Sequence, residues 1–142
     1  MIDLTSLRSI YEEYDEIALK VRQNASPFAG IMGLGNDPRK DRCHMEFYNK
    51  VKDWLEEFRS SSPGPDDVYS VVYEILNAAD CRRKTETFWF NFSAHGLVVE
   101  LIPLMTPEQC RQLMEYYDAH FPKLERMPVH KTLYKELKKA AK

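Results

Sequence analysis

Apolar residues recur every three or four positions through most of this 142-residue chain, and this spacing limits the possible folds more than any other feature. The first such stretch follows Leu4, Leu7, Tyr11, Tyr14, Ala18 and Val21, with Ile10 and Ile17 beside them. A spacing of three and four residues places side chains on one face of an α-helix. We therefore predict an all-α protein, a single compact bundle of about six helices over residues 1–142.

Capping and turn residues divide the chain into helices. The clearest signal is Thr106-Pro107-Glu108-Gln109, in which Thr106 and Gln109 fit a capping box and Pro107 fits the first helical position. The predicted helices run from Asp3 or Thr5 to about Asn24, from Asp41 to about Arg59, from near Asp66 to about Ala79, from Pro107 to about His120, and from Val129 to about Ala141.

The segment 86–103 fits two secondary structures. Phe88, Phe90 and Phe92 alternate as in a strand, whereas Phe88, Phe92, His95, Val99 and Ile102 fit a helix that ends at Pro103. We favour the helix because its register covers the whole segment, while the alternation covers only the first half. The choice between helix and strand stays open for residues 86–94.

Composition argues against several classes of protein. A formal net charge of -2, from 20 basic and 22 acidic residues, makes a nucleic-acid or membrane-surface binder unlikely. Three separated cysteines do not form a disulfide framework, which favours a reducing, cytoplasmic setting. The acidic N-terminal stretch does not resemble a signal peptide, and no stretch is long and apolar enough to cross a bilayer.

The stretch from Ala29 to Arg42 is predicted to be a glycine-rich loop between the first two helices. It leads into the first turn of the second helix, where free backbone N–H groups and the helix dipole favour an anion. Basic residues add positive charge beside that turn. The candidate phosphate-binding or ligand-binding residues are Gly33, Gly35, Arg39, Arg42 and His44.

One catalytic constellation is conceivable from the sequence. Cys43, in that same first turn, would be the nucleophile, with His95 as base and Asn91 to orient the base. The competing interpretation is structural, since free cysteines are commonly buried apolar residues and a histidine on an apolar face is commonly a core residue. The common hydrolase, kinase and nucleotide-binding motifs are absent from the sequence, so an enzyme is the less favoured hypothesis.

The sequence predicts neither a metal nor a cofactor, because no pair of cysteines or histidines has the spacing typical of metal ligands. His120 and His130 fall near predicted helix ends, where a capping or solvent-exposed role is expected.

A nucleic-acid hypothesis depends on the last two predicted helices. Residues 106–117 and 129–142 faintly resemble a helix-turn-helix pair with a lysine-rich second helix, but the turn between them is too long for that motif. The lysines near the C-terminal end of the last helix also suit the helix dipole. These lysines are Lys131, Lys135, Lys138, Lys139 and Lys142.

The leading hypothesis is therefore a small, cytoplasmic, non-enzymatic protein-interaction module. Its partner is expected to contact the Ala29–Arg42 loop, where Met32 and Leu34 supply apolar surface. Self-association through the apolar face of the first helix is the second possibility. The alternatives are a small-ligand or phosphate-binding protein or enzyme that uses Cys43 and His95, and a helix-turn-helix-like DNA binder.

Overall fold

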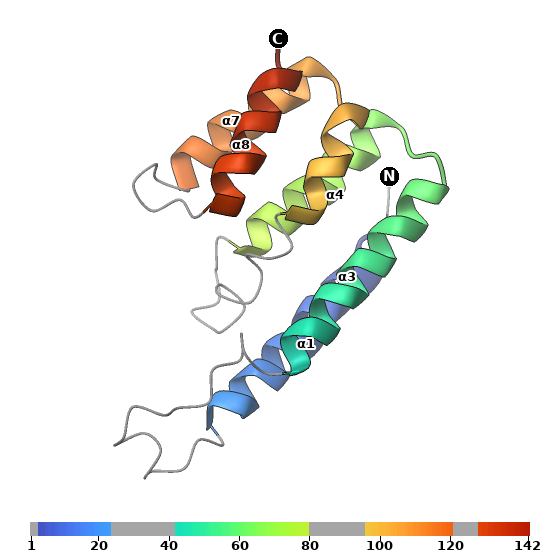
Figure 1. The fold of residues 1–142 in the computed structure, drawn as a ribbon. Coiled ribbons are helices and arrows are strands. Elements are labelled where there is room, and N and C mark those ends of the chain that lie inside the picture. The colour runs from blue at the N-terminus through green and yellow to red at the C-terminus, as the bar shows by residue number, and fades with distance from the viewer. Residues whose placement is uncertain (1–2, 24–41, 80–95, 121–127) are drawn as a thin grey trace.

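The computed structural model describes residues 3–23, 42–79, 96–120 and 128–142. The helices in these ranges are α1 (Thr5–Gln23), α3 (Arg42–Ser60), α4 (Pro65–Ala79), the 3-10 helix η2 (Val98–Leu104), α7 (Pro107–His120) and α8 (Pro128–Ala140) (Figure 1). No strand occurs among the described residues, and the prediction of an all-α bundle of about six helices is confirmed. The predicted glycine-rich loop and the segment 86–94 lie outside the described residues.

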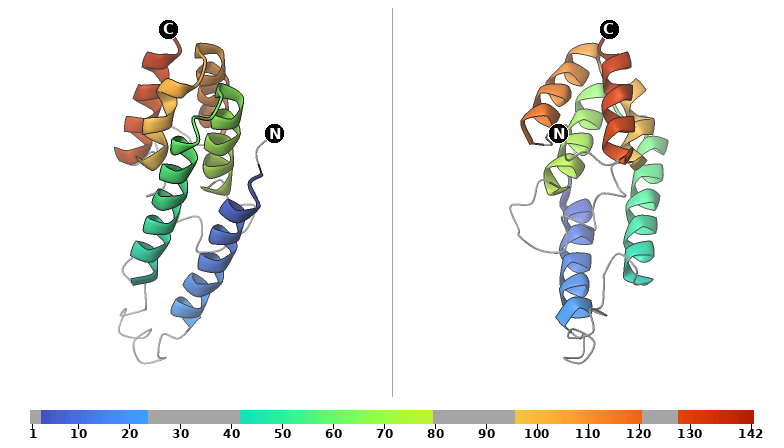
Figure 2. Two further views of the ribbon diagram at one scale, coloured as in Figure 1. Left: turned by 90° about the vertical axis from the view of Figure 1, so that its right-hand side faces the viewer. Right: turned by 60° about the vertical axis from the view of Figure 1, so that its left-hand side comes forward.

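Helices α1 and α3 form an antiparallel pair (Figures 1 and 2). Tyr11 and Tyr14 of α1 pack edge-on against Phe47 of α3, with ring centroids 5.2 and 5.9 Å apart. Near the other end of the pair, the Trp54 indole N–H donates to Ser6 Oγ at 2.8 Å. Leu7, Tyr11 and Tyr14 on the apolar face of α1 are therefore buried within the molecule. Self-association through this face stays a prediction.

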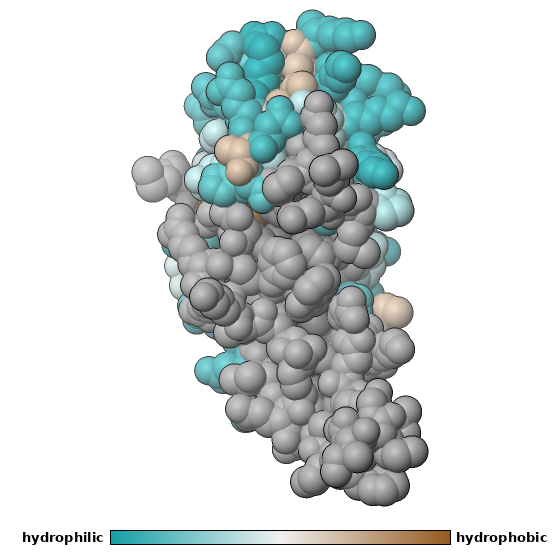
Figure 3. Space-filling model, turned by 90° about the vertical axis from the view of Figure 1, so that its left-hand side faces the viewer, coloured by the Kyte–Doolittle hydropathy of each residue, from teal (hydrophilic) through white to brown (hydrophobic). Residues whose placement is uncertain are grey.

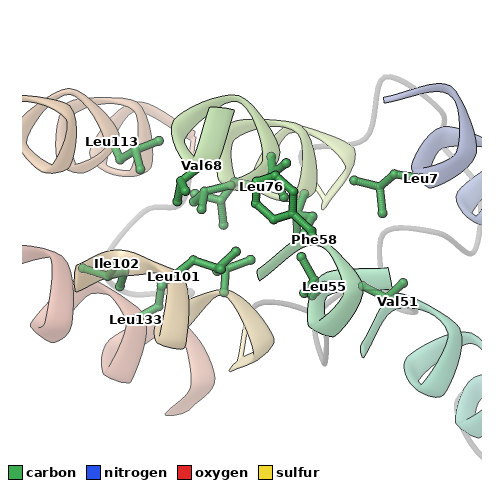
Figure 4. Close-up of a cluster of buried hydrophobic side chains, with 14 of the residues drawn as sticks. Leu7, Val51, Leu55, Phe58, Val68, Leu76, Leu101, Ile102, Leu113 and Leu133 are labelled. Carbon is green, nitrogen blue, oxygen red and sulfur yellow. The ribbon is translucent and has the colours of Figure 1, made fainter. Parts of the chain in front are cut away.

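Helix α4 lies at the centre of the hydrophobic core. Its five core residues are completely buried, at the positions Val68, Val71, Val72, Ile75 and Leu76. Although β-branched residues favour strands, their spacing of three and four predicts a helix, and packing overrides propensity here. Figure 4 shows side chains from all six described helices meeting in this core, among them Leu7, Leu55, Leu101, Leu113 and Leu133.

The segment before Pro103 differs in detail from its prediction. A helix that ends at Pro103 was expected to bury Val99, but η2 includes Pro103 and buries Val98, Leu101 and Ile102. A 3-10 helix has three residues per turn, so Val98 and Leu101 align on one face. The ring of Pro103 is tolerated because it lies in the last turn, where Met105 N–H donates to Ile102 O at 3.1 Å.

Helices α7 and α8 form a second antiparallel pair (Figures 1 and 2). Arg111 near the start of α7 donates to Ala141 O at 2.8 Å, beyond the end of α8, and Tyr134 OH donates to Asp118 Oδ2 at 3.0 Å. The capping box of α7 is present: Gln109 N–H donates to Thr106 Oγ1 at 3.2 Å, and Thr106 N–H donates to Gln109 Oε1 at 3.0 Å. This predicted start signal is confirmed.

His130 corrects the expectation of a capping or solvent-exposed residue. It is only 2% exposed, and its ring centroid lies 6.2 Å from that of Tyr117. The reason is that α8 begins at Pro128, which makes His130 part of the first helical turn. There it shares the buried face of Leu133 and Leu137, three and seven residues further on.

Candidate functional site

Of the three predicted catalytic residues, only Cys43 lies in the described part of the structure. Cys43 lies in the first turn of α3, is only 5% exposed and belongs to the hydrophobic core. Its position agrees with the interpretation as a buried apolar residue. Asn91 and His95 lie outside the described residues, so their convergence with Cys43 stays a prediction.

Of the predicted ligand-binding residues, Arg42 and His44 lie in the described part of the structure. The Arg42 side chain is almost fully exposed, and its Nε lies 3.2 Å from Glu46 Oε1 one turn further along α3. This carboxylate competes with any anion for the Arg42 charge. His44 is half-buried, and Gly33, Gly35 and Arg39 lie outside the described residues.

Among the residues that the structure describes, no three His, Cys, Asp or Glu side chains are close enough to hold a metal ion. None of the described helices combines the length and the hydropathy needed to span a bilayer.

The most distinctive charged feature of the described surface is a row of lysines on α8 and just after its end, which we call the lysine stripe. Its members Lys131, Lys135, Lys138 and Lys142 are all exposed. The three on α8 are spaced four and three residues apart, which keeps them within an arc of about 60° over a length of about 10 Å, and Lys142 lies two residues beyond Ala140, where α8 ends. Lys142 follows the last helical hydrogen bond, from Ala141 N–H to Leu137 O at 2.9 Å.

The lysine stripe is not neutralised by neighbouring carboxylates. Within the described ranges, none of its four ammonium groups forms a salt bridge with a carboxylate. The one acid of α8, Glu136, instead lies 3.4 Å from Lys139, which follows Lys135 by four residues and flanks the stripe. The stripe therefore presents uncompensated positive charge to solvent.

The packing of α8 holds the stripe in place. Leu133 and Leu137, on the opposite face, are completely buried. Tyr134 fixes α8 to α7 through its hydrogen bond to Asp118. The described residues at the top of Figure 3, where α7 and α8 lie, are predominantly hydrophilic.

The lysine stripe also contrasts with the rest of the chain. Residues 128–142 contain five lysines and one glutamate, whereas the remaining residues contain 15 basic and 21 acidic side chains. The helix dipole accounts for the position of these lysines near a C-terminal helix end but not for their common face. The spacing of four, three and four from Lys131 to Lys142 is the sequence signal for that face.

The helix-turn-helix hypothesis can be compared with the α7–α8 geometry. In that motif the two helices cross at about 90–120°. Here the contacts of Arg111 with Ala141 and of Asp118 with Tyr134 show that α7 and α8 run antiparallel along their lengths. These contacts differ from the crossing expected of that motif, and DNA binding by α8 stays a prediction.

No protein-family model matches this chain, and neither curated proteins nor solved structures show a significant similarity to it.

Proposed function

We propose that this protein is a non-enzymatic protein-interaction module that binds an acidic segment of a partner protein along the lysine stripe of α8. The observation that carries the proposal is the row of four exposed lysines that lack a carboxylate partner within the described residues. Such a row attracts negative charge and increases the rate of association with an acidic partner.

The chemistry of the stripe favours an acidic polypeptide over a nucleic acid. A long duplex carries charge along its whole length and would be repelled by the excess of acidic residues outside α8. Lysine is a point charge without the planar fork by which arginine recognises phosphate and guanine. A short acidic segment touches the stripe alone, and carboxylates one helical turn apart match its spacing.

The test uses a synthetic helical peptide with glutamates at positions i, i+4, i+7 and i+11, and a second peptide with glutamine at these positions. We expect the first peptide to bind in a salt-dependent manner and the second to bind much more weakly. The variant Lys131→Glu/Lys135→Glu should weaken binding by about tenfold or more.

A matched control reverses two charges at the far end of the α1–α3 pair. The variant Lys20→Glu/Arg42→Glu changes the net charge by the same amount and should bind the acidic peptide nearly as well as the wild type. Equal binding of the two peptides, or unchanged binding by the Lys131→Glu/Lys135→Glu variant, would refute the proposal. Tighter binding to a DNA duplex than to the acidic peptide would refute the choice of a protein partner.

A further inference from the structure

Helix α3 has a long exposed face on the side away from α1. Its residues are Met45, Asn49, Lys52, Glu56 and Ser60, which we call the outer α3 face. Their spacing of four, three, four and four places them on one narrow strip, about 22 Å long. In the right-hand view of Figure 2, α3 lies at the edge of the molecule.

The two ends of the outer α3 face differ, because one carries a projecting side chain and the other a depression. Near its start, Met45 projects into solvent with 63% of its surface exposed. At its other end is an open depression of about 440 Å³, lined by Glu56, Arg59, Ser60 and Leu104. Leu104 is 41% exposed there, and it is the other large apolar side chain that is exposed in the described part of the chain.

The middle of the outer α3 face carries a basic side chain followed by acidic side chains. Lys52 and Glu56 lie on the face and Asp53 lies at its edge, and all three side chains are exposed. Within the described residues none of the three takes part in a salt bridge, whereas Lys50 on the flank lies 3.5 Å from Glu13 of α1. The charges at the centre of the face are therefore available to another molecule.

We propose that two copies of this chain associate through their outer α3 faces, with the two α3 helices antiparallel about a two-fold axis near residues 52 and 53. In this arrangement Met45 of each copy meets Ser60 and the depression of the other copy. Lys52 of each copy lies opposite Asp53 and Glu56 of the other. A two-fold interface makes every such contact twice, which is why a self-complementary strip suits it.

The charge order selects the antiparallel arrangement. Parallel α3 helices would place Lys52 against Lys52 and Met45 against Met45, and both depressions would stay uncovered. One helix face of this length gives a small interface, so the dimer is expected to be weak and in rapid exchange with the monomer.

The experiment is sedimentation velocity of the full chain over a range of concentrations, combined with a charge exchange. Lys52→Glu, or Asp53→Lys/Glu56→Lys, places like charges across the axis, and each variant alone should raise the dimer dissociation constant by about tenfold. An equimolar mixture of the two variants restores opposite charges at both pairs. The mixture should therefore dimerise like the wild type.

Two further variants keep the test specific. Met45→Asp should weaken the dimer, because it places a charge against Leu104 of the other copy. Lys131→Glu/Lys135→Glu should not affect dimerisation, which separates this interface from the lysine stripe. Circular dichroism checks that each variant is folded.

A wild-type protein that stays monomeric into the submillimolar range would overturn the proposal. So would a mixture of the two charge variants that stays monomeric. Acidic-peptide binding is measured separately. A protein that does not dimerise can therefore still bind the peptide, and a protein that does not bind the peptide can still dimerise.

Discussion

The Gln109 side chain joins the starts of two helices, because its Nε2 donates to Asp66 Oδ1 at 2.8 Å. The oxygen of the same amide group, Oε1, accepts a hydrogen bond from the Thr106 N–H and so completes the capping box of α7. Asp66 lies in the first turn of α4. One amide group therefore caps α7 and holds it against the start of α4, which a carboxylate at position 109 cannot do.

The variant Gln109→Ala should lower the free energy of unfolding by about 1–2 kcal/mol, because both the cap and the link to α4 are lost. Gln109→Glu should lower the free energy of unfolding by a smaller amount, since it keeps the acceptor for the Thr106 N–H. It still costs some stability, because it places a second negative charge beside Asp66. Urea denaturation measures the free energy of unfolding of both variants. The matched control is Gln112→Ala on the same helix, where the side chain is exposed and the effect should be close to zero.

Ser62 follows α3 with a φ of 53°, in the left-handed region. Side chains are strained there, whereas glycine is not. We expect Ser62→Gly to raise the free energy of unfolding by about 0.5–1 kcal/mol. As a control, Ser61→Gly should lower it, because Ser61 Oγ donates to Phe58 O at 2.6 Å. A loss of stability in Ser62→Gly would contradict the assigned conformation.

Burial raises the pKa of the Cys110 thiol above its ordinary value, and the nearby positive charge of Arg111 offsets only part of this effect. The unfolded chain therefore loses this proton first as the pH rises. The corresponding stability is fully present below the unfolded thiol pKa of about 8.5 and is lost at higher pH. We expect the difference in unfolding free energy between wild type and Cys110→Ala to shrink as the pH rises above the unfolded thiol pKa. A constant difference would contradict the shift.

Cys43 and Cys110 are both buried, with 5% and 0% of their surfaces exposed. Iodoacetamide should therefore modify both slowly in the native protein and quickly in denaturant, as measured by mass spectrometry of the digested chain. Rapid native labelling of Cys43 alone would contradict its structural role. That result would instead favour the hypothesis of a reactive thiol.

Most of the fold was predictable because the local and tertiary signals agree. The capping residues Thr106 and Gln109 define the start of α7, and the spacing of Val68, Val71 and Ile75 identifies α4 despite its valines. The 3-10 form of η2 was not predictable from spacing, because three-residue and 3.6-residue periods differ little over so few residues.

The candidate sites were less predictable. His130 was assigned from its distance to a helix end, although its spacing to Leu133 and Leu137 identifies the buried face. The depression beside Leu104 depends on how η2 meets the end of α3, and this tertiary arrangement cannot be read from local sequence.

The central claim, that α8 binds acidic polypeptide through its lysines, is tested most directly by titrating the glutamate peptide into wild type and Lys131→Glu/Lys135→Glu at several salt concentrations. We expect the wild-type affinity to fall steeply with salt, and the variant to bind weakly with little salt dependence. Equal affinities and equal salt dependence for the two proteins would contradict the claim.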